Sequence, residues 1–373
     1  MKPIPSLVFI QIFIYFLSVL PLMSSIKWKN NKLYIKSTNN YKDCVICLGL
    51  LFCIFATYDG DWYHYSEIFT LDPRNIDNLY SIEPSHKWII KNLSLGSYIF
   101  WRVIIWGSIF IFYYLSLKRL DENNLITWCC FTCMTMLQIS TGRVYLGIAI
   151  LFYGFCCILI PKKGLYSILK GLIIMFISLI FHKSIFIYLT ATGAALLFNN
   201  RKLLMLSLIC FPFALKIFIT LLSYYLLGLE AANSATNYLQ KDTLDTGIGN
   251  MLYSIPVKVT IVLIIAFYYF YLLKAHPFSE NLKTQRKLWQ YCYNILYLYF
   301  IIYFALTFNG IGAASISNRV LIGLYFPIPI LMSRLIQTKY KNKFIISIWV
   351  ICYIIGTYRL FYAWYLQRIG AGV

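Results

Sequence analysis

The acidic side chains that could catalyse a reaction stand beside long apolar stretches. Asp59 and Asp61 directly follow one such stretch, and Glu83 precedes Pro84 shortly before the next. A carboxylate can act as a general base or hold a substrate hydroxyl, and Pro84 restricts Glu83 to extended backbone conformations. We therefore take these three acids as candidate catalytic groups, the alternative for each being a solvated loop charge.

Basic side chains occupy comparable positions and could bind an anion. Arg143 falls between two apolar stretches with almost no loop, and a guanidinium offers a planar fork of donors that matches phosphate oxygens. His182 and Lys183 pair a group that exchanges protons near neutral pH with a fixed positive charge. Arg319 opens a later apolar stretch. We expect Arg143, Lys183 and Arg319 to bind phosphate, unless they simply reach lipid headgroups. His182 joins the acids as a catalytic candidate.

Sugar contacts are a weaker expectation for three further side chains, Tyr63, Arg102 and Arg359. Aromatic rings suit sugar faces, but they also suit the headgroup layer of a membrane. The Asp59-x-Asp61 pair is too short to identify a metal site, and the cysteines lie in or beside apolar stretches without a matching Cys/His set. The expectation is a protein without a metal or cofactor.

The composition is that of an integral membrane protein. Hydrophobic residues make up 60% of the chain and charged residues 12%, with a mean hydropathy of +0.69, whereas soluble domains carry roughly a quarter charged residues. The net charge of +20 lies mostly in short loops between apolar stretches, as in cytoplasmic loops of membrane proteins. We therefore expect contact with membrane lipids and no binding of nucleic acid.

The predicted fold is all-α, a polytopic membrane domain that spans residues 1–373 with about 12 transmembrane helices, each of about 20 residues. Basic loops fall on one side in strict alternation, which puts both termini outside. The two large outer loops are residues 58–97 and 227–252. The expected spans are residues 4–26, 43–57, 98–117, 125–141, 144–160, 165–181, 185–198, 203–226, 253–273, 291–308, 319–335 and 344–366.

This topology gathers the candidate groups at one face. Nine of the thirteen carboxylates fall on the outer side, together with the phosphate-binding and catalytic candidates. A polar cluster that distant helices assemble at one membrane face suits an enzyme or carrier for an anionic, lipid-anchored substrate.

The order of these motifs resembles the EpsG family of membrane proteins, which is related to the Wzy-type polymerases of bacterial surface polysaccharides. The resemblance depends most on residues 181–184 (Phe-His-Lys-Ser), then on residues 59–63 and on Glu83-Pro84. The chain departs from the family pattern at residues 85–86, where Ser-His stands in place of Gly and an aromatic residue. It departs again after Arg143, where Val replaces Gln.

The resemblance implies a metal-independent glycosyltransferase in the bacterial cytoplasmic membrane, with its active site facing outward. Such an enzyme joins oligosaccharide repeat units carried on a polyprenyl diphosphate into an O-antigen, capsule or exopolysaccharide. Flippase and chain-length regulator proteins are then expected partners. The cationic groups would stabilise the diphosphate as its charge develops, and a carboxylate or His182 would accept the proton of the acceptor hydroxyl.

Three other functions fit parts of the pattern. A flippase for lipid-linked sugars would need basic groups at several depths, whereas most basic helix-end groups here lie at one face. A membrane O-acyltransferase could use His182 as its base, but it would draw its acyl donor from the cytoplasm, on the other side. The third is a structural subunit of a synthesis complex.

Overall fold

The computed structural model describes Phe13, residues 26–29, 32–35, 41–55, 68–69, 82–137, 142–182, 184–197, 248–274, 280–308 and 320–337, and Ile354. The predicted spans 4–26, 203–226 and 344–366 lie almost wholly outside this part of the chain.

Helices dominate the described structure. They are α2 (Lys42–Phe55), α5 (Pro84–Asn92), α6 (Tyr98–Leu120), α7 (Leu125–Leu137), α8 (Arg143–Leu159), α9 (Leu165–Ile177), η2 (Ser178–Ile180), α10 (Ile185–Leu197), α13 (Ile248–Lys274), α14 (Glu280–Phe308), η3 (Ile322–Leu324) and α16 (Pro327–Gln337). A two-stranded antiparallel hairpin, β1 (Ile26–Lys29) and β2 (Lys32–Ile35), is the exception in these ranges.

The described helices are those of a helical membrane protein, although they do not establish twelve spans. Among them α6 is long and apolar enough to cross a bilayer, and shorter apolar helices include residues 143–159, 165–180 and 185–197. The outward faces of α6 and α9 expose large apolar side chains such as Ile111, Ile173 and Phe176.

Helix boundaries differ from the prediction where polar residues form helix, because the prediction followed hydrophobicity. α14 begins at Glu280 rather than at 291, so Lys283, Arg286 and Lys287 lie on the helix and not in a loop. The placement of these cations in a loop was wrong, because polar residues can continue a helix beyond its apolar part. α13 likewise begins at Ile248, inside the predicted loop 227–252, and α5 lies inside the predicted loop 58–97.

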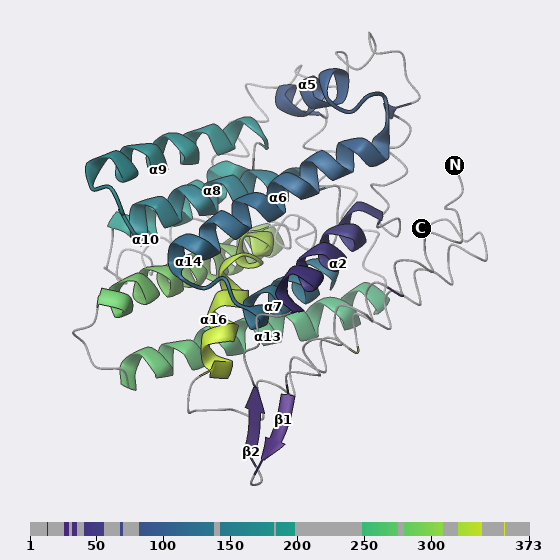
Figure 1. Cartoon of the computed structure of the whole chain (residues 1–373). Helices are drawn as coiled ribbons and strands as arrows, with labels where there is room; N and C mark the ends of the chain where they lie inside the picture. Colours follow the sequence, from purple (N-terminus) through teal and green to yellow (C-terminus); the bar gives the residue numbers. More distant parts are fainter. Residues whose placement is uncertain are drawn as a thin grey trace.

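Glycines bring α8 and α9 into backbone contact. A Cβ built at Gly171 would lie 2.7 Å from the Gly154 carbonyl oxygen, and one built at Gly154 would lie 2.8 Å from the Gly171 carbonyl oxygen. Small residues at such crossings let membrane helices approach closely. The two helices run side by side with α6 in the bundle (Figure 1).

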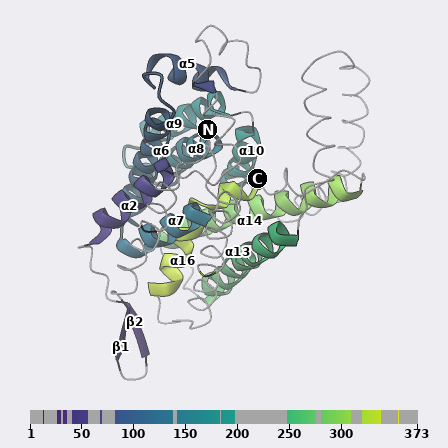
Figure 2. The same cartoon turned by 90° about the vertical axis from the view of Figure 1, so that its right-hand side faces the viewer.

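Polar contacts join the helices at one end of this bundle. The Arg119 Nε donates to the Ile160 carbonyl at 3.0 Å, and its Nη2 donates to Ser167 Oγ at 3.0 Å. Arg334 on α16 pairs with Glu122 after α6 at 2.5 Å. The helix α5 lies at the opposite end, away from the hairpin, in both views (Figures 1 and 2). The bundle therefore has two distinct polar ends.

We expect Gly171→Ala to lower the free energy of unfolding by about 1–3 kcal/mol, because the added methyl group overpacks the contact with Gly154. Gly193→Ala on α10 is the matched control, since nothing lies within 4 Å of a Cβ there. That control should be neutral or stabilising by up to about 1 kcal/mol, because alanine favours helix more than glycine. Thermal unfolding in detergent measures both, and equal stability of the two variants would contradict the contact.

Candidate active site

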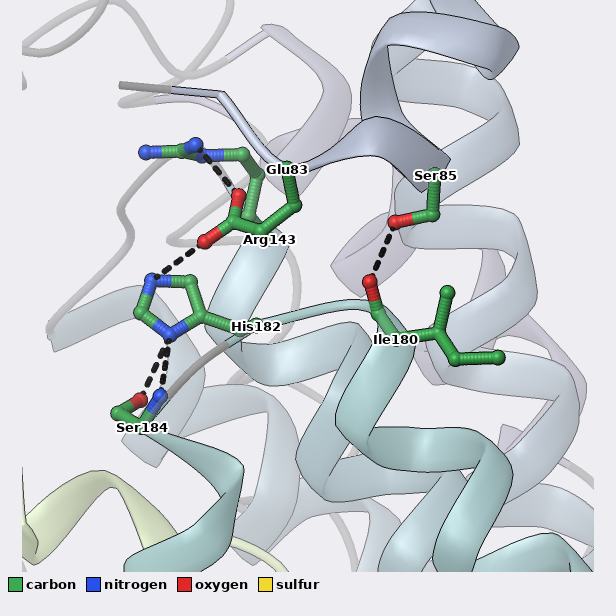
Figure 3. A network of polar contacts seen from close by, with 6 residues as sticks. All are labelled: Glu83, Ser85, Arg143, Ile180, His182 and Ser184. Carbon is green, nitrogen blue, oxygen red and sulfur yellow. Dashed lines mark hydrogen bonds and ion pairs between the residues drawn. The ribbon is translucent and has the colours of Figure 1, made fainter. Parts of the chain in front are cut away.

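Three predicted side chains from distant parts of the chain meet at the α5 end of the bundle (Figure 3). The Arg143 Nη1 donates to Glu83 Oε2 at 2.8 Å, and His182 Nε2 lies 3.5 Å from Glu83 Oε1. Their side chains are 14%, 10% and 15% exposed for Arg143, Glu83 and His182. The cluster is thus largely screened from solvent, with a small fraction of each side chain exposed.

The helix start of α5 aims Glu83 into this cluster. Glu83 is the N-cap residue, with extended backbone (φ −63°, ψ 148°) and Pro84 in the first helical turn. Its carbonyl accepts from the Lys87 amide at 3.0 Å, but its side chain makes no capping bond. The carboxylate is therefore free of its own helix and binds Arg143 and His182 instead.

Arg143 is placed by a glycine that no other residue could replace without strain. Gly142 is the N-cap of α8 and has φ +87°, a conformation that L side chains rarely adopt. A Cβ there would also lie 2.9 Å from Ile105 Cγ2 and 3.2 Å from the Trp106 ring. The absence of a side chain at 142 lets the start of α8 rest directly on α6, which fixes where Arg143 emerges.

Hydrogen bonds at Ser184 define the tautomer of His182. The Ser184 backbone amide donates to His182 Nδ1 at 3.1 Å, and Ser184 Oγ lies 2.7 Å from the same nitrogen. A backbone amide can only donate, so Nδ1 accepts and the proton of the neutral ring is on Nε2. That Nε2–H faces the Glu83 carboxylate, and both ring nitrogens are engaged.

Three helices begin at this cluster. Glu83 caps α5, Arg143 is the first residue of α8, and Ser184 directly precedes α10. Helix N-termini carry a partial positive charge from their free amide groups. Together with the Arg143 guanidinium, they make this end of the bundle favourable for an anion.

Two residues that sequence reasoning missed lie beside the cluster. Ser85 Oγ donates to the Ile180 carbonyl at 2.8 Å (Figure 3). His86 is fully buried, and burial, followed by the charges of Arg143 and His182, lowers its pKa from 6.5 to about 3. The signal that could have identified them is their position directly after Glu83-Pro84. In the same way, Ser184 follows His182 closely in the sequence.

The remaining predicted residues fall into two groups. Arg102 is 1% exposed on α6, where it donates to Tyr98 Oη at 3.1 Å and to the Cys53 carbonyl, so it joins α6 to α2. The others lie outside the described residues: Asp59, Asp61, Tyr63, Lys183, Arg319 and Arg359. Within the described ranges no three His, Cys, Asp or Glu side chains are grouped as metal ligands.

The fold and the site together define a class of protein. It is a helical membrane protein in which an acid, an imidazole and an arginine meet where three helices begin. The chain belongs to the EpsG family, whose model matches residues 40–370 and so includes the whole cluster. This is a family of Wzy-like polymerases. Neither the curated proteins nor the solved structures include a match to this chain.

We expect the wild-type protein to lose stability relative to His86→Phe as the pH falls below about 6.5. The unfolded chain binds a proton at His86 near that pH, whereas the folded protein does so only near 3. For one such group the loss is about 2 kcal/mol at pH 5. Thermal unfolding of both proteins near pH 7.5 and pH 5 measures it. All other titrating groups are shared, so an identical pH dependence of the two proteins would show that His86 is not held neutral.

Proposed function

We propose that this protein is a glycosyltransferase that polymerises oligosaccharide repeat units carried on a polyprenyl diphosphate, at the outer face of the bacterial cytoplasmic membrane. Membership of a family of Wzy-like polymerases supports the polymerase activity. The single observation that carries the mechanism is the contact of Glu83 with both Arg143 and His182.

A lipid-linked diphosphate is already a leaving group, so the reaction needs two things from the protein. The bond between the donor sugar and the diphosphate breaks while a hydroxyl of the acceptor sugar attacks and loses its proton. Arg143 and the three helix N-termini supply positive potential where the diphosphate charge develops. Lys183 and Arg319 would add to it. No nucleotide sugar and no metal enters this scheme.

Glu83 is the best-placed base. Nδ1 of His182 is occupied by Ser184 and its Nε2 carries a proton, so the neutral ring has no free lone pair for a substrate. A carboxylate has about four acceptor sites, of which Arg143 and His182 use two. A diphosphate competes with Glu83 for Arg143, and the carboxylate released by that exchange can accept the hydroxyl proton. Asp59 and Asp61 remain candidates from sequence.

The sidedness of the proposal comes from the basic groups at the far end of the bundle. Arg119, Lys287 and Arg334 lie in or directly beside the basic loops that the alternation of loops predicts to be cytoplasmic. Lys287 Nζ donates to the Leu196 carbonyl at the end of α10 at 3.0 Å. Arg119, near the end of α6, contacts the Ile160 carbonyl. Arg334 pairs with Glu122, just after α6 ends. If these groups face the cytoplasm, Glu83 at the start of α5 faces outward.

The same geometry weighs against the O-acyltransferase alternative. Such an enzyme needs a histidine nitrogen with a free lone pair to deprotonate a sugar hydroxyl, whereas Nδ1 of His182 accepts from the Ser184 amide and Nε2 carries the proton of the neutral ring. For the polymerase, a flippase that supplies the lipid-linked unit and a regulator of chain length are natural partners.

We expect Arg143→Ala to lower polymerisation by about 100- to 1,000-fold, because it removes a group that stabilises transition-state charge. Glu83→Gln keeps the shape of the acid but abolishes its basicity, and should lower turnover comparably. Arg143→Lys should recover part of the activity, since it restores the charge without the planar fork. The measurement is conversion of lipid-linked repeat units into polymer by the purified protein.

Lys170→Ala is the control for these variants, because it removes an exposed cation from α9, outside the cluster. It should leave polymerisation unchanged. Normal chain length in Glu83→Gln would eliminate Glu83 as the base. Accumulation of single repeat units on the inner leaflet of a deletion strain, rather than the outer one, would instead favour a flippase.

A further inference from the structure

The contact between Glu83 and His182 is too weak to hold its two segments together. At 3.5 Å it lies beyond the usual range of a hydrogen bond. Glu83 stands at the start of α5 and His182 in the turn that follows η2, almost one hundred residues later in the chain. Something else must keep the imidazole opposite the carboxylate.

Ser85 makes one direct link between these segments. Its hydroxyl donates to the carbonyl of Ile180, the last residue of η2, at 2.8 Å (Figure 3). Ser85 is two residues after Glu83, and Ile180 is two residues before His182. The bond therefore joins the two chain segments immediately beside the groups that must meet.

His86 fills the space behind this link. Its ring packs edge-on against Trp101 of α6, with centroids 6.2 Å apart at 74°, and against Phe181 at 6.1 Å and 78°. Phe181 is the neighbour of His182, so the His86 ring lies between α6 and the turn that presents the imidazole. Edge-to-face pairs of this kind stabilise the packing beyond the apolar area that they bury.

The ring of His86 packs as a neutral aromatic group and not as a polar one. It is fully buried, and neither ring nitrogen has a hydrogen-bond partner of normal geometry among the described residues. The Phe181 backbone favours the charged form, but burial and the charges of Arg143 and His182 oppose it more strongly. A phenyl ring should therefore replace the imidazole without loss.

We propose that Ser85 and His86 are positioning residues that lock α5 onto the Phe181–His182 turn and thereby hold the imidazole of His182 against Glu83. The lock is a property of the fold. Its effect on turnover rests on the proposed function, in which Glu83, held beside His182, accepts the proton of the acceptor hydroxyl.

The test reads the state of His182 directly. The chain contains four histidines, so nuclear magnetic resonance of ¹⁵N-histidine-labelled protein in nanodiscs can resolve each ring, with His182→Gln identifying its signal. In wild type and His86→Phe, His182 should show the tautomer protonated at Nε2. In His86→Ala the Nε2 signal should move toward the one seen in Glu83→Gln, where the carboxylate charge is lost, while Nδ1 stays bonded to Ser184. Ser85→Ala, which keeps the core intact, should move the Nε2 signal in the same direction.

Turnover is measured on the same proteins. A misplacement of about 1 Å can cost on the order of 100-fold in rate, so His86→Ala should lower kcat by about that factor with little change in KM. His86→Phe should restore kcat to near the wild-type value. Trp88→Ala is the matched control, because Trp88 is an exposed aromatic on the same helix, and it should change neither reading.

Each result decides a separate point. A His86→Phe protein as impaired as His86→Ala would show that a ring nitrogen is required, which overturns the aromatic lock. An unchanged His182 signal in His86→Ala and Ser85→Ala would overturn it too, as would an equal effect of Trp88→Ala. If the signals shift as expected but the wild-type protein makes no polymer, the lock stands and the proposed function fails.

Discussion

The ion pair of Glu83 with Arg143 is the interaction on which the rest of the site depends. It joins a helix start in a predicted outer loop to the first residue of a buried helix, and it screens two opposite charges in a largely apolar environment. Removing either partner would leave the other charge partly buried without compensation, which is costly. The pair therefore explains how one arginine is tolerated at a crowded helix N-terminus, where a positive charge is otherwise unfavourable.

The sequence predicted the cluster because its members are unusual in their surroundings. An arginine between two apolar stretches and a histidine between two short ones have few roles in a membrane protein, and the structure brings both to Glu83. Ser85 and His86 escaped because their roles depend on Ile180 and Trp101, which are distant in sequence. Arg102 carries the same charge as Arg143, yet its contacts with Tyr98 and the Cys53 carbonyl cannot be read from spacing.

Some helix boundaries could be predicted from the sequence and others could not. The starts and ends of α6, α8 and α10 follow hydrophobicity within a few residues, since apolar length is what a bilayer selects. Hydrophobicity carries no information about polar helix, so the first eleven residues of α14 and the whole of α5 were assigned to loops. The predicted span 319–335 also missed that α16 begins at Pro327, although proline favours the first turn of a helix.

The backbone contact between Gly154 and Gly171 sets the spacing of two helices that position the site. Neither glycine leaves room for a Cβ against the other's carbonyl oxygen, so α8 and α9 pack closely, with Arg143 at the start of one helix and His182 beyond the end of the other. Each glycine stands eleven residues from the polar group on its own segment, so a bulkier side chain at either position would act on the arginine and the imidazole from a distance, by separating the helices that carry them.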